Sequence, residues 1–169
     1  MMNAKQLMIG LGFSMMAAAS VPALANDAKT LPGAACQPKS GSSTAFEINS
    51  NGQLINTSTT DLTVICPIIR DVMAANGSNG INKAQVHVID RNVDRSFTCT
   101  LRSHATNTGG YGSSSRNTGN SFASANVQPL EYGNLASSAD GYYFFECTIP
   151  GTYSGNLSSI VTYNWNEAD

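Results

Sequence analysis

Residues 84–102, AQVHVIDRNVDRSFTCTLR, decide the fold that we expect for this chain. In the first half, Val86 and Val88 point to one side of an extended chain, while His87 and Ile89 point to the other. In the second half an apolar set alternates with polar residues, and this set is Phe97, Cys99 and Leu101. A period of two with β-branched residues is typical of strands, and Asp and Asn between them favour a turn. The stretch therefore predicts a hairpin with one buried face.

The same pattern continues on both sides of this stretch. Asn51-Gly52 predicts a hairpin between residues 46–48 and 53–56, through a type I′ turn with positive φ at both central residues. Further strands are expected at 62–66, 122–130, 142–149 and 158–165, the first ending at Pro67 because proline has no N–H to donate. We expect an arm and then a short strand over 26–43, a long turn over 70–82 with a helical turn at 71–75, and a long loop or loosely paired edge over 104–121. The whole predicts an all-β fold, an antiparallel β-sandwich (jelly-roll or immunoglobulin-like) of about seven or eight strands.

Residues 1–25 have the three parts of a secretory signal peptide. Lys5 supplies the positive start, residues 7–21 are apolar, and Ala23-Leu24-Ala25 is a small-residue cleavage site. We therefore expect a single domain over residues 26–169, secreted or periplasmic, with no membrane anchor after cleavage. The formal net charge of −2 gives no electrostatic footprint for nucleic acid.

The cysteines indicate covalent cross-links. An even count in an exported chain predicts two disulfides, and the spacings fit neither a zinc site nor a CxxC motif, so no metal or cofactor is expected. Three connectivities are possible for four cysteines. Cys99 and Cys147 lie in similar apolar stripes, which favours Cys99–Cys147 together with Cys36–Cys66.

Several short motifs, taken in order over residues 51–167, resemble a group of exported bacterial proteins of unassigned function. The resemblance implies export, disulfides and a β fold, and it brings no activity. The motifs are Gly52-x-Leu54-x-Asn56, Val64-x-Cys66-Pro67, Val86-x-Val88-x-Asp90-Arg91, Cys99-x-Leu101, Tyr143-x-x-x-Cys147-x-Ile149-Pro150 and Ser159-Ile160-x-x-Tyr163.

Residues suited to catalysis or metal binding are few. His87 lies within an expected strand, His104 opens a polar loop, and no serine has a GxSxG setting, so we predict no catalytic residue and no enzyme. Asp90, Asn92 and Asp94 resemble the start of a calcium loop, but the glycine and glutamate that such a loop needs are replaced by arginine and leucine. Turn capping is the better interpretation of these residues.

Aromatic side chains offer the one hint of a ligand. Tyr111, Tyr132, Tyr153 and Trp165 could stack on sugar rings, and Tyr111 and Trp165 are our candidate ligand contacts. We assign a second group of aromatic residues to the core: Tyr143, Phe145 and Tyr163.

The leading hypothesis is a non-enzymatic binding or structural protein at the cell surface or in the periplasm. One alternative is a carbohydrate-binding module, another an unrecognised secreted hydrolase, and a third a subunit of a surface assembly that pairs by edge strands. The expected partner is accordingly a carbohydrate or another surface protein.

Overall fold

The computed structural model describes residues 28–39, 46–70, 80–105, 111–119, 124–135 and 141–167. The predicted signal peptide, the helical turn at 71–75 and most of the turn at 70–82 lie outside these ranges. In the part of the chain that the structure describes, no helix is long and apolar enough to cross a membrane.

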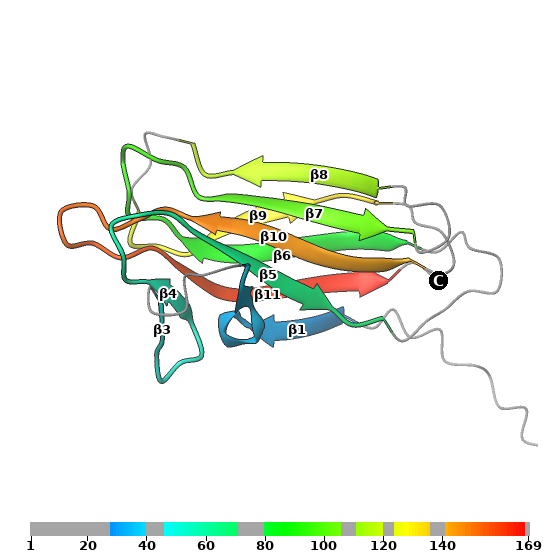
Figure 1. Ribbon diagram of the computed structural model, residues 1–169. Helices are drawn as coiled ribbons and strands as arrows, with labels where there is room; N and C mark the ends of the chain where they lie inside the picture. The colour runs from blue at the N-terminus through cyan, green and yellow to red at the C-terminus, as the bar shows by residue number, and fades with distance from the viewer. Residues whose placement is uncertain are drawn as a thin grey trace, which may run out of the picture.

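Two antiparallel sheets pack face to face, which confirms the predicted β-sandwich (Figure 1). The five-stranded sheet has the order β2 (Gln37–Pro38), β5 (Leu62–Ile68), β10 (Tyr142–Ile149), β7 (Thr98–His104) and β8 (Tyr111–Asn117). The six-stranded sheet has the order β3 (Phe46–Ile48), β4 (Leu54–Asn56), β11 (Ser159–Glu167), β6 (Ile81–Ile89) and β9 (Gln128–Tyr132), and β1 (Ala28–Pro32) also pairs with β11. The described residues contain 11 strands, more than the seven or eight expected.

The predicted hairpin over residues 84–102 is wrong, although both of its strands exist. β6 belongs to the six-stranded sheet and β7 to the five-stranded sheet, so residues 90–97 form an arch that crosses from one sheet to the other. Asp90 is fully buried, and its two carboxylate oxygens accept hydrogen bonds from the backbone N–H groups of Asn92 and Phe97, both at 3.0 Å. These bonds satisfy N–H groups inside the arch that a hairpin would have paired across strands.

Contacts from distant parts of the chain hold the arch at one end of the sandwich. Thr118 and Ser158 donate hydroxyl hydrogen bonds to Asp90, and the Asn92 amide donates to the Gly151 carbonyl at 2.8 Å. Asn92 also accepts the N–H groups of Asp94 and Arg95. Turn capping, the interpretation preferred from the sequence, is therefore confirmed for Asp90 and Asn92.

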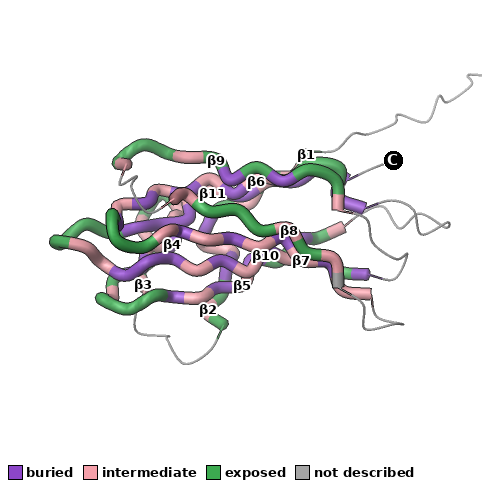
Figure 2. Tube along the Cα trace, turned by 90° about the horizontal axis from the view of Figure 1, so that it is seen from above, coloured by how far each residue is buried: buried purple, intermediate pink, exposed green. Residues whose placement is uncertain are grey.

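The core fills the space between the two sheets, and buried residues alternate mostly with half-buried ones along the strands (Figure 2). The inward phase of β7 and β10 is the one predicted from their apolar stripes, and Tyr143, Phe145 and Tyr163 are core residues as expected. Fully buried side chains include Leu62, Val64, Val86, Val88, Phe97, Leu101, Phe145, Ile149, Ile160 and Tyr163.

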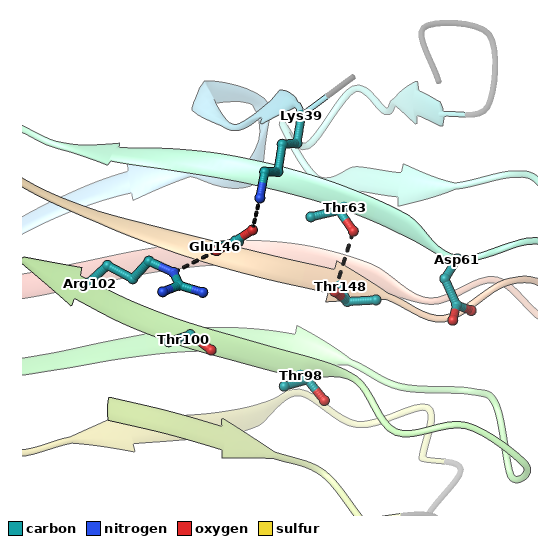
Figure 3. A pocket seen from close by; sticks show the side chains of 8 residues that line it. All are labelled: Lys39, Asp61, Thr63, Thr98, Thr100, Arg102, Glu146 and Thr148. Carbon is teal, nitrogen blue, oxygen red and sulfur yellow. Dashed lines mark hydrogen bonds and ion pairs between the residues drawn. The ribbon is translucent and has the colours of Figure 1, made fainter. Parts of the chain in front are cut away.

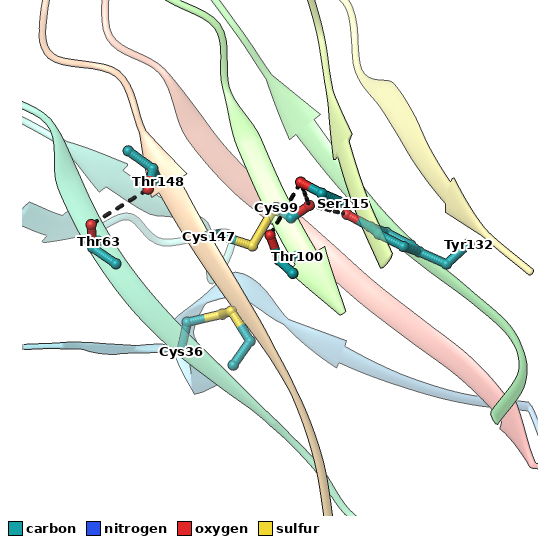
Figure 4. Close-up of a disulfide and its surroundings, with 9 residues drawn as sticks. Cys36, Thr63, Cys99, Thr100, Ser115, Tyr132, Cys147 and Thr148 are labelled. Carbon is teal, nitrogen blue, oxygen red and sulfur yellow. Dashed lines mark hydrogen bonds between the residues drawn. A yellow bond between two sulfur atoms is a disulfide. The ribbon is translucent and has the colours of Figure 1, made fainter. Parts of the chain in front are cut away.

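Both disulfides join neighbouring strands of the five-stranded sheet. Cys99 of β7 is bonded to Cys147, its register partner on β10, and Cys36, just before β2, is bonded to Cys66 of β5. The preferred connectivity is therefore the one found. Figure 4 shows Tyr132, from the opposite sheet, donating its hydroxyl to the carbonyl of Cys99 at 2.9 Å.

Four local expectations need correction or refinement. Residues 28–32 of the expected arm form β1, and residues 111–117 form the edge strand β8, which agrees with the paired-edge alternative for residues 104–121. β5 continues through Pro67, because β2 has ended there and no neighbour on that side needs the missing N–H. The hairpin at Asn51-Gly52 is confirmed, but only Gly52 has positive φ, +74°, and its N–H closes the turn on the Asn49 carbonyl.

Candidate functional site

The outward face of the five-stranded sheet carries the candidate site. Side chains of the outward phase line up in rows across the strands, because directly opposed residues of an antiparallel pair share a face. Going along the sheet, one row holds Thr63, Thr148 and Thr98, the next Ile65, Glu146 and Thr100, and the third Pro67, Phe144 and Arg102. Successive rows lie about 7 Å apart, so polar, charged and aromatic groups follow one another along one surface.

Glu146 is the centre of a charged cluster in this face. Lys39 Nζ donates to one of its carboxylate oxygens, and Arg102 Nε donates to the other at 2.5 Å (Figure 3). The Lys39 ammonium holds the pKa of the Glu146 carboxyl below its usual range; Arg102 adds to this effect, and partial burial opposes it. Glu146 is therefore ionised near neutral pH and fixes both cations in place.

A groove of about 560 Å³ surrounds this cluster. Its remaining walls are hydroxyl groups from β5, β7 and β10 and a carboxylate just before β5, namely Thr63, Thr98, Thr100, Thr148 and Asp61. Asp61 is already engaged, since one of its oxygens accepts from Arg95 at 2.9 Å and from the Gly151 N–H at 3.1 Å. The groove therefore offers hydrogen-bonding groups in place of an apolar lining.

An aromatic strip begins where the charged cluster ends. The Tyr142 ring stacks on His104 with centroids 5.0 Å apart and on Phe144 at 6.0 Å. Tyr142 is 51% exposed, and Ile65 and Pro67 complete an apolar hollow beside these rings. From Tyr142 to Glu146 the face extends for about 13 Å, given four residues of strand.

The two aromatic residues proposed from the sequence have different outcomes. Trp165 is only 1% exposed and its ring stacks on Tyr163 inside the sandwich, so the expectation of a ligand contact there is corrected: an external ligand does not reach it. Tyr111 begins β8, and its backbone pairs with His104 at the end of the aromatic strip. A ligand contact at Tyr111 stays a prediction.

The other aromatic and histidine candidates are also placed. Tyr132 is buried, and burial raises the pKa of its hydroxyl while Arg116 opposes that rise. Tyr153 is partly exposed in the turn that precedes β11. His87 lies on the outward face of the six-stranded sheet, where Nδ1 is 3.2 Å from the Thr162 hydroxyl. None of these joins the groove.

Sequence reasoning missed Tyr142, Phe144 and the charged cluster. A signal for the two rings was present, because Tyr142 and Phe144 occupy the phase of their strand opposite to the apolar stripe. No comparable signal existed for the cluster, since Lys39 and Glu146 are 107 residues apart.

The comparisons with known proteins are distant. No protein-family model and no curated protein matches the sequence. Among solved structures, the chain is similar to a low-affinity xylan-binding module from Roseburia intestinalis (11% identity, 84% of this chain and 96% of the module, TM-score 0.48). It is also similar to the xylan-binding module CBM15 (9% identity, 85% and 98%, TM-score 0.49).

A third similar structure is a family two carbohydrate esterase from Cellvibrio japonicus, at 8% identity and a TM-score of 0.47. The alignment covers 84% of this chain but only 34% of the esterase, so this chain spans about a third of that protein's length.

Proposed function

We propose that this protein is an exported, non-enzymatic binding protein whose ligand is an oligosaccharide. The ligand lies along the outward face of β5, β10 and β7. The observation that carries the proposal is the exposed, stacked aromatic strip of Tyr142, Phe144 and His104 directly beside a groove of polar side chains.

This combination suits the chemistry of a sugar. A pyranose ring has an apolar C–H face, which packs on an aromatic ring, and a rim of hydroxyls, which need hydrogen-bond donors and acceptors. The aromatic strip supplies the first, and the threonine hydroxyls with the ionised cluster supply the second. An oligosaccharide, longer than one sugar, would use both parts of a face about 13 Å long.

The state of the carboxylates supports binding over hydrolysis. Glycoside hydrolysis needs one carboxyl group whose pKa is raised, so that it can act as general acid. In the groove, Glu146 has a lowered pKa because of Lys39 and Arg102, and Asp61 is held by Arg95. Both carboxylates thus serve to position cations.

Export is supported by the covalent structure. All four cysteines are in disulfides, and such bonds persist in oxidising compartments outside the cytoplasm. The predicted signal peptide over residues 1–25 would direct the chain there. Secretion or a periplasmic location follows as part of the proposal.

Binding to a panel of soluble oligosaccharides, measured by calorimetry with the disulfide-bonded protein, tests the function. Tyr142→Ala should weaken binding about tenfold, or about 1.4 kcal/mol, because the exposed stacking surface is lost. Tyr142→Phe keeps the ring and should bind nearly as well as the wild type.

Val127→Ala is the matched control, because Val127 is also about half exposed and lies away from this face. Equal affinity of the Tyr142→Ala and Val127→Ala proteins, with both correctly folded, would rule out the aromatic strip as the binding surface. Failure of the wild type to bind any sugar in the panel would overturn the function itself.

A further inference from the structure

We infer that the oligosaccharide is acidic, and that Arg102 and Lys39 bind a carboxylate on one of its sugar units. This inference rests on the proposed function and narrows it to sugars of the uronic acid class. The observation behind it is the way Glu146 holds two cations while leaving most of their hydrogen-bond donors unused.

Arg102 is the main element of this subsite for an acidic sugar. Its Nε donates to Glu146, and its two terminal nitrogens have no partner among the residues that the structure describes. Figure 3 shows these nitrogens turned away from Glu146. The outer edge of a guanidinium group presents two parallel N–H bonds, which match the two oxygens of a carboxylate.

Lys39 adds a second donor from the opposite side of Glu146. Its ammonium group uses one hydrogen for Glu146 and is about half exposed, so two further hydrogens face solvent at the groove. Because the carboxyl of Glu146 has a lowered pKa, it stays charged and keeps both cations positioned before a ligand arrives. Such preorganisation lowers the entropic cost of binding.

The local charge also favours an anion. Two cations, Lys39 and Arg102, and two carboxylates, Asp61 and Glu146, line the groove, and a third cation, Arg95, pairs with Asp61 beside it. One net positive charge therefore remains on this face, although the chain as a whole has a formal net charge of −2. A structural ion pair would need only one cation for each carboxylate, and Glu146 has two.

The position of Arg102 relates the charge to the aromatic strip. Arg102 and Phe144 are register partners on β7 and β10, so the guanidinium group and the ring lie side by side on the same face. A sugar packed on the strip would thus place a carboxyl substituent within reach of the cluster. This juxtaposition distinguishes the subsite from an exposed surface ion pair, which contributes little by itself.

The test compares acidic oligosaccharides with the same molecules after their carboxyl groups have been reduced to neutral hydroxymethyl groups. We expect the disulfide-bonded full-length protein to bind at least one acidic member of a panel of oligogalacturonate, alginate and glucuronoxylan fragments. Its neutral counterpart, of identical linkage and length, should bind at least tenfold more weakly. Raising NaCl from 20 to 200 mM should reduce this preference, because the groove is open to solvent.

Variants separate a specific contact from general charge. Arg102→Gln should abolish the preference for the acidic form, and Arg102→Lys should restore only part of it, because lysine lacks the two-pronged geometry. Lys83→Gln is the control, since it removes one positive charge from the outward face of the other sheet. All proteins are first checked by thermal melting and circular dichroism.

The outcomes distinguish this inference from the function on which it rests. Equal binding of acidic and neutral forms, or an unchanged preference in a folded Arg102→Gln protein, would overturn the inference that Arg102 and Lys39 bind a sugar carboxylate. Oligosaccharide binding itself would stay intact. Binding of inorganic phosphate as tightly as the acidic fragment would indicate a general anion site and would equally overturn it. If the protein bound no acidic and no neutral sugar, both proposals would be overturned.

Discussion

The outward faces of the two sheets follow the same alternation rule but differ in how their polar groups are used. On the six-stranded sheet these groups mostly satisfy each other: Gln85 donates to Glu131 at 2.8 Å, Asn164 donates to Gln85 at 3.4 Å, and Thr162 meets His87. On the five-stranded sheet, exposed rings adjoin a groove in which cations keep unused donors. A polar strand face is therefore a candidate binding site only where its hydrogen-bond donors and acceptors are not already paired with each other.

The sheets differ in their covalent structure as well. Both disulfides lie in the five-stranded sheet, whose edge strands are the two-residue β2 and the serine-rich β8. The six-stranded sheet has no disulfide among its described residues, and its two central strands, β6 and β11, are nine residues long. The two disulfides thus stabilise the sheet that carries the proposed site, where a rigid support keeps side chains in position.

Of the changes considered, removing the disulfides one at a time should have the largest effect on the stability of the five-stranded sheet. On the chain-entropy account, loss of Cys99–Cys147 or of Cys36–Cys66 costs roughly 4 kcal/mol each, because closed loops of 48 and 30 residues are released. We expect the Cys99→Ala/Cys147→Ala protein not to accumulate after export. The Cys36→Ala/Cys66→Ala protein should fold at reduced stability, with faster hydrogen exchange in β2 and β5.

Equal protection of the two sheets in the Cys36→Ala/Cys66→Ala protein would contradict the view that the staple serves the edge of one sheet. Wild-type levels of soluble Cys99→Ala/Cys147→Ala protein would show that β7 and β10 need no covalent link. Urea denaturation gives the change in free energy of unfolding for each variant that can be purified.

Gly33→Ala should damage both sheets together, because Gly33 lies where the chain leaves β1 of one sheet for β2 of the other. A Cβ at this position would come within 2.2 Å of the Ile160 carbonyl oxygen and 3.0 Å of the Leu54 nitrogen, both backbone atoms. We expect a loss of about 3 kcal/mol in the free energy of unfolding. Gly133→Ala, with open space around the added atom, should change it by less than about 0.5 kcal/mol.

High pH should weaken the link between the sheets. Tyr163 of β11 donates its hydroxyl to the Pro67 carbonyl of β5, and burial raises the pKa of this hydroxyl to about 12. An unfolded tyrosine releases its proton near pH 10, so between pH 10 and 12 the unfolded state binds fewer protons and stability falls as pH rises. This contribution to stability is fully present below pH 10 and is lost as the pH rises toward 12.

Urea denaturation at several pH values from 8 to 11.5 measures this effect, and Tyr163→Phe is the informative variant. It loses the hydrogen bond at every pH, and its stability should then fall less steeply above pH 10 than that of the wild type. Identical slopes for the two proteins would mean that Tyr163 does not carry the alkaline sensitivity.

The sequence predicted the inward side of this fold better than its connections or its outward side. Alternation around Cys99 and Cys147 was enough to identify the core faces and the disulfide pairing, because those features are local to two strands. The arch after Asp90 was mistaken for a hairpin turn, since two of its hydrogen-bond partners, Thr118 and Ser158, come from distant segments. The candidate site depends on strand register, which no single segment contains: Arg102 adjoins Phe144 only because β7 pairs with β10.

Two small substitutions, one on each outward face, would sharpen the contrast between the sheets. Thr100→Val removes a hydroxyl that lines the groove and donates to Ser115 at 3.2 Å, and Gln85→Ala removes the amide that bonds to Glu131. Each should lower the free energy of unfolding by less than about 1 kcal/mol, because each removes partly exposed hydrogen bonds. Only Thr100→Val should also weaken oligosaccharide binding, by a few-fold in calorimetry. If Gln85→Ala impaired binding as much, the outward face of the six-stranded sheet would also contact the ligand. The presence of polar groups without partners in the protein would then no longer identify the binding face.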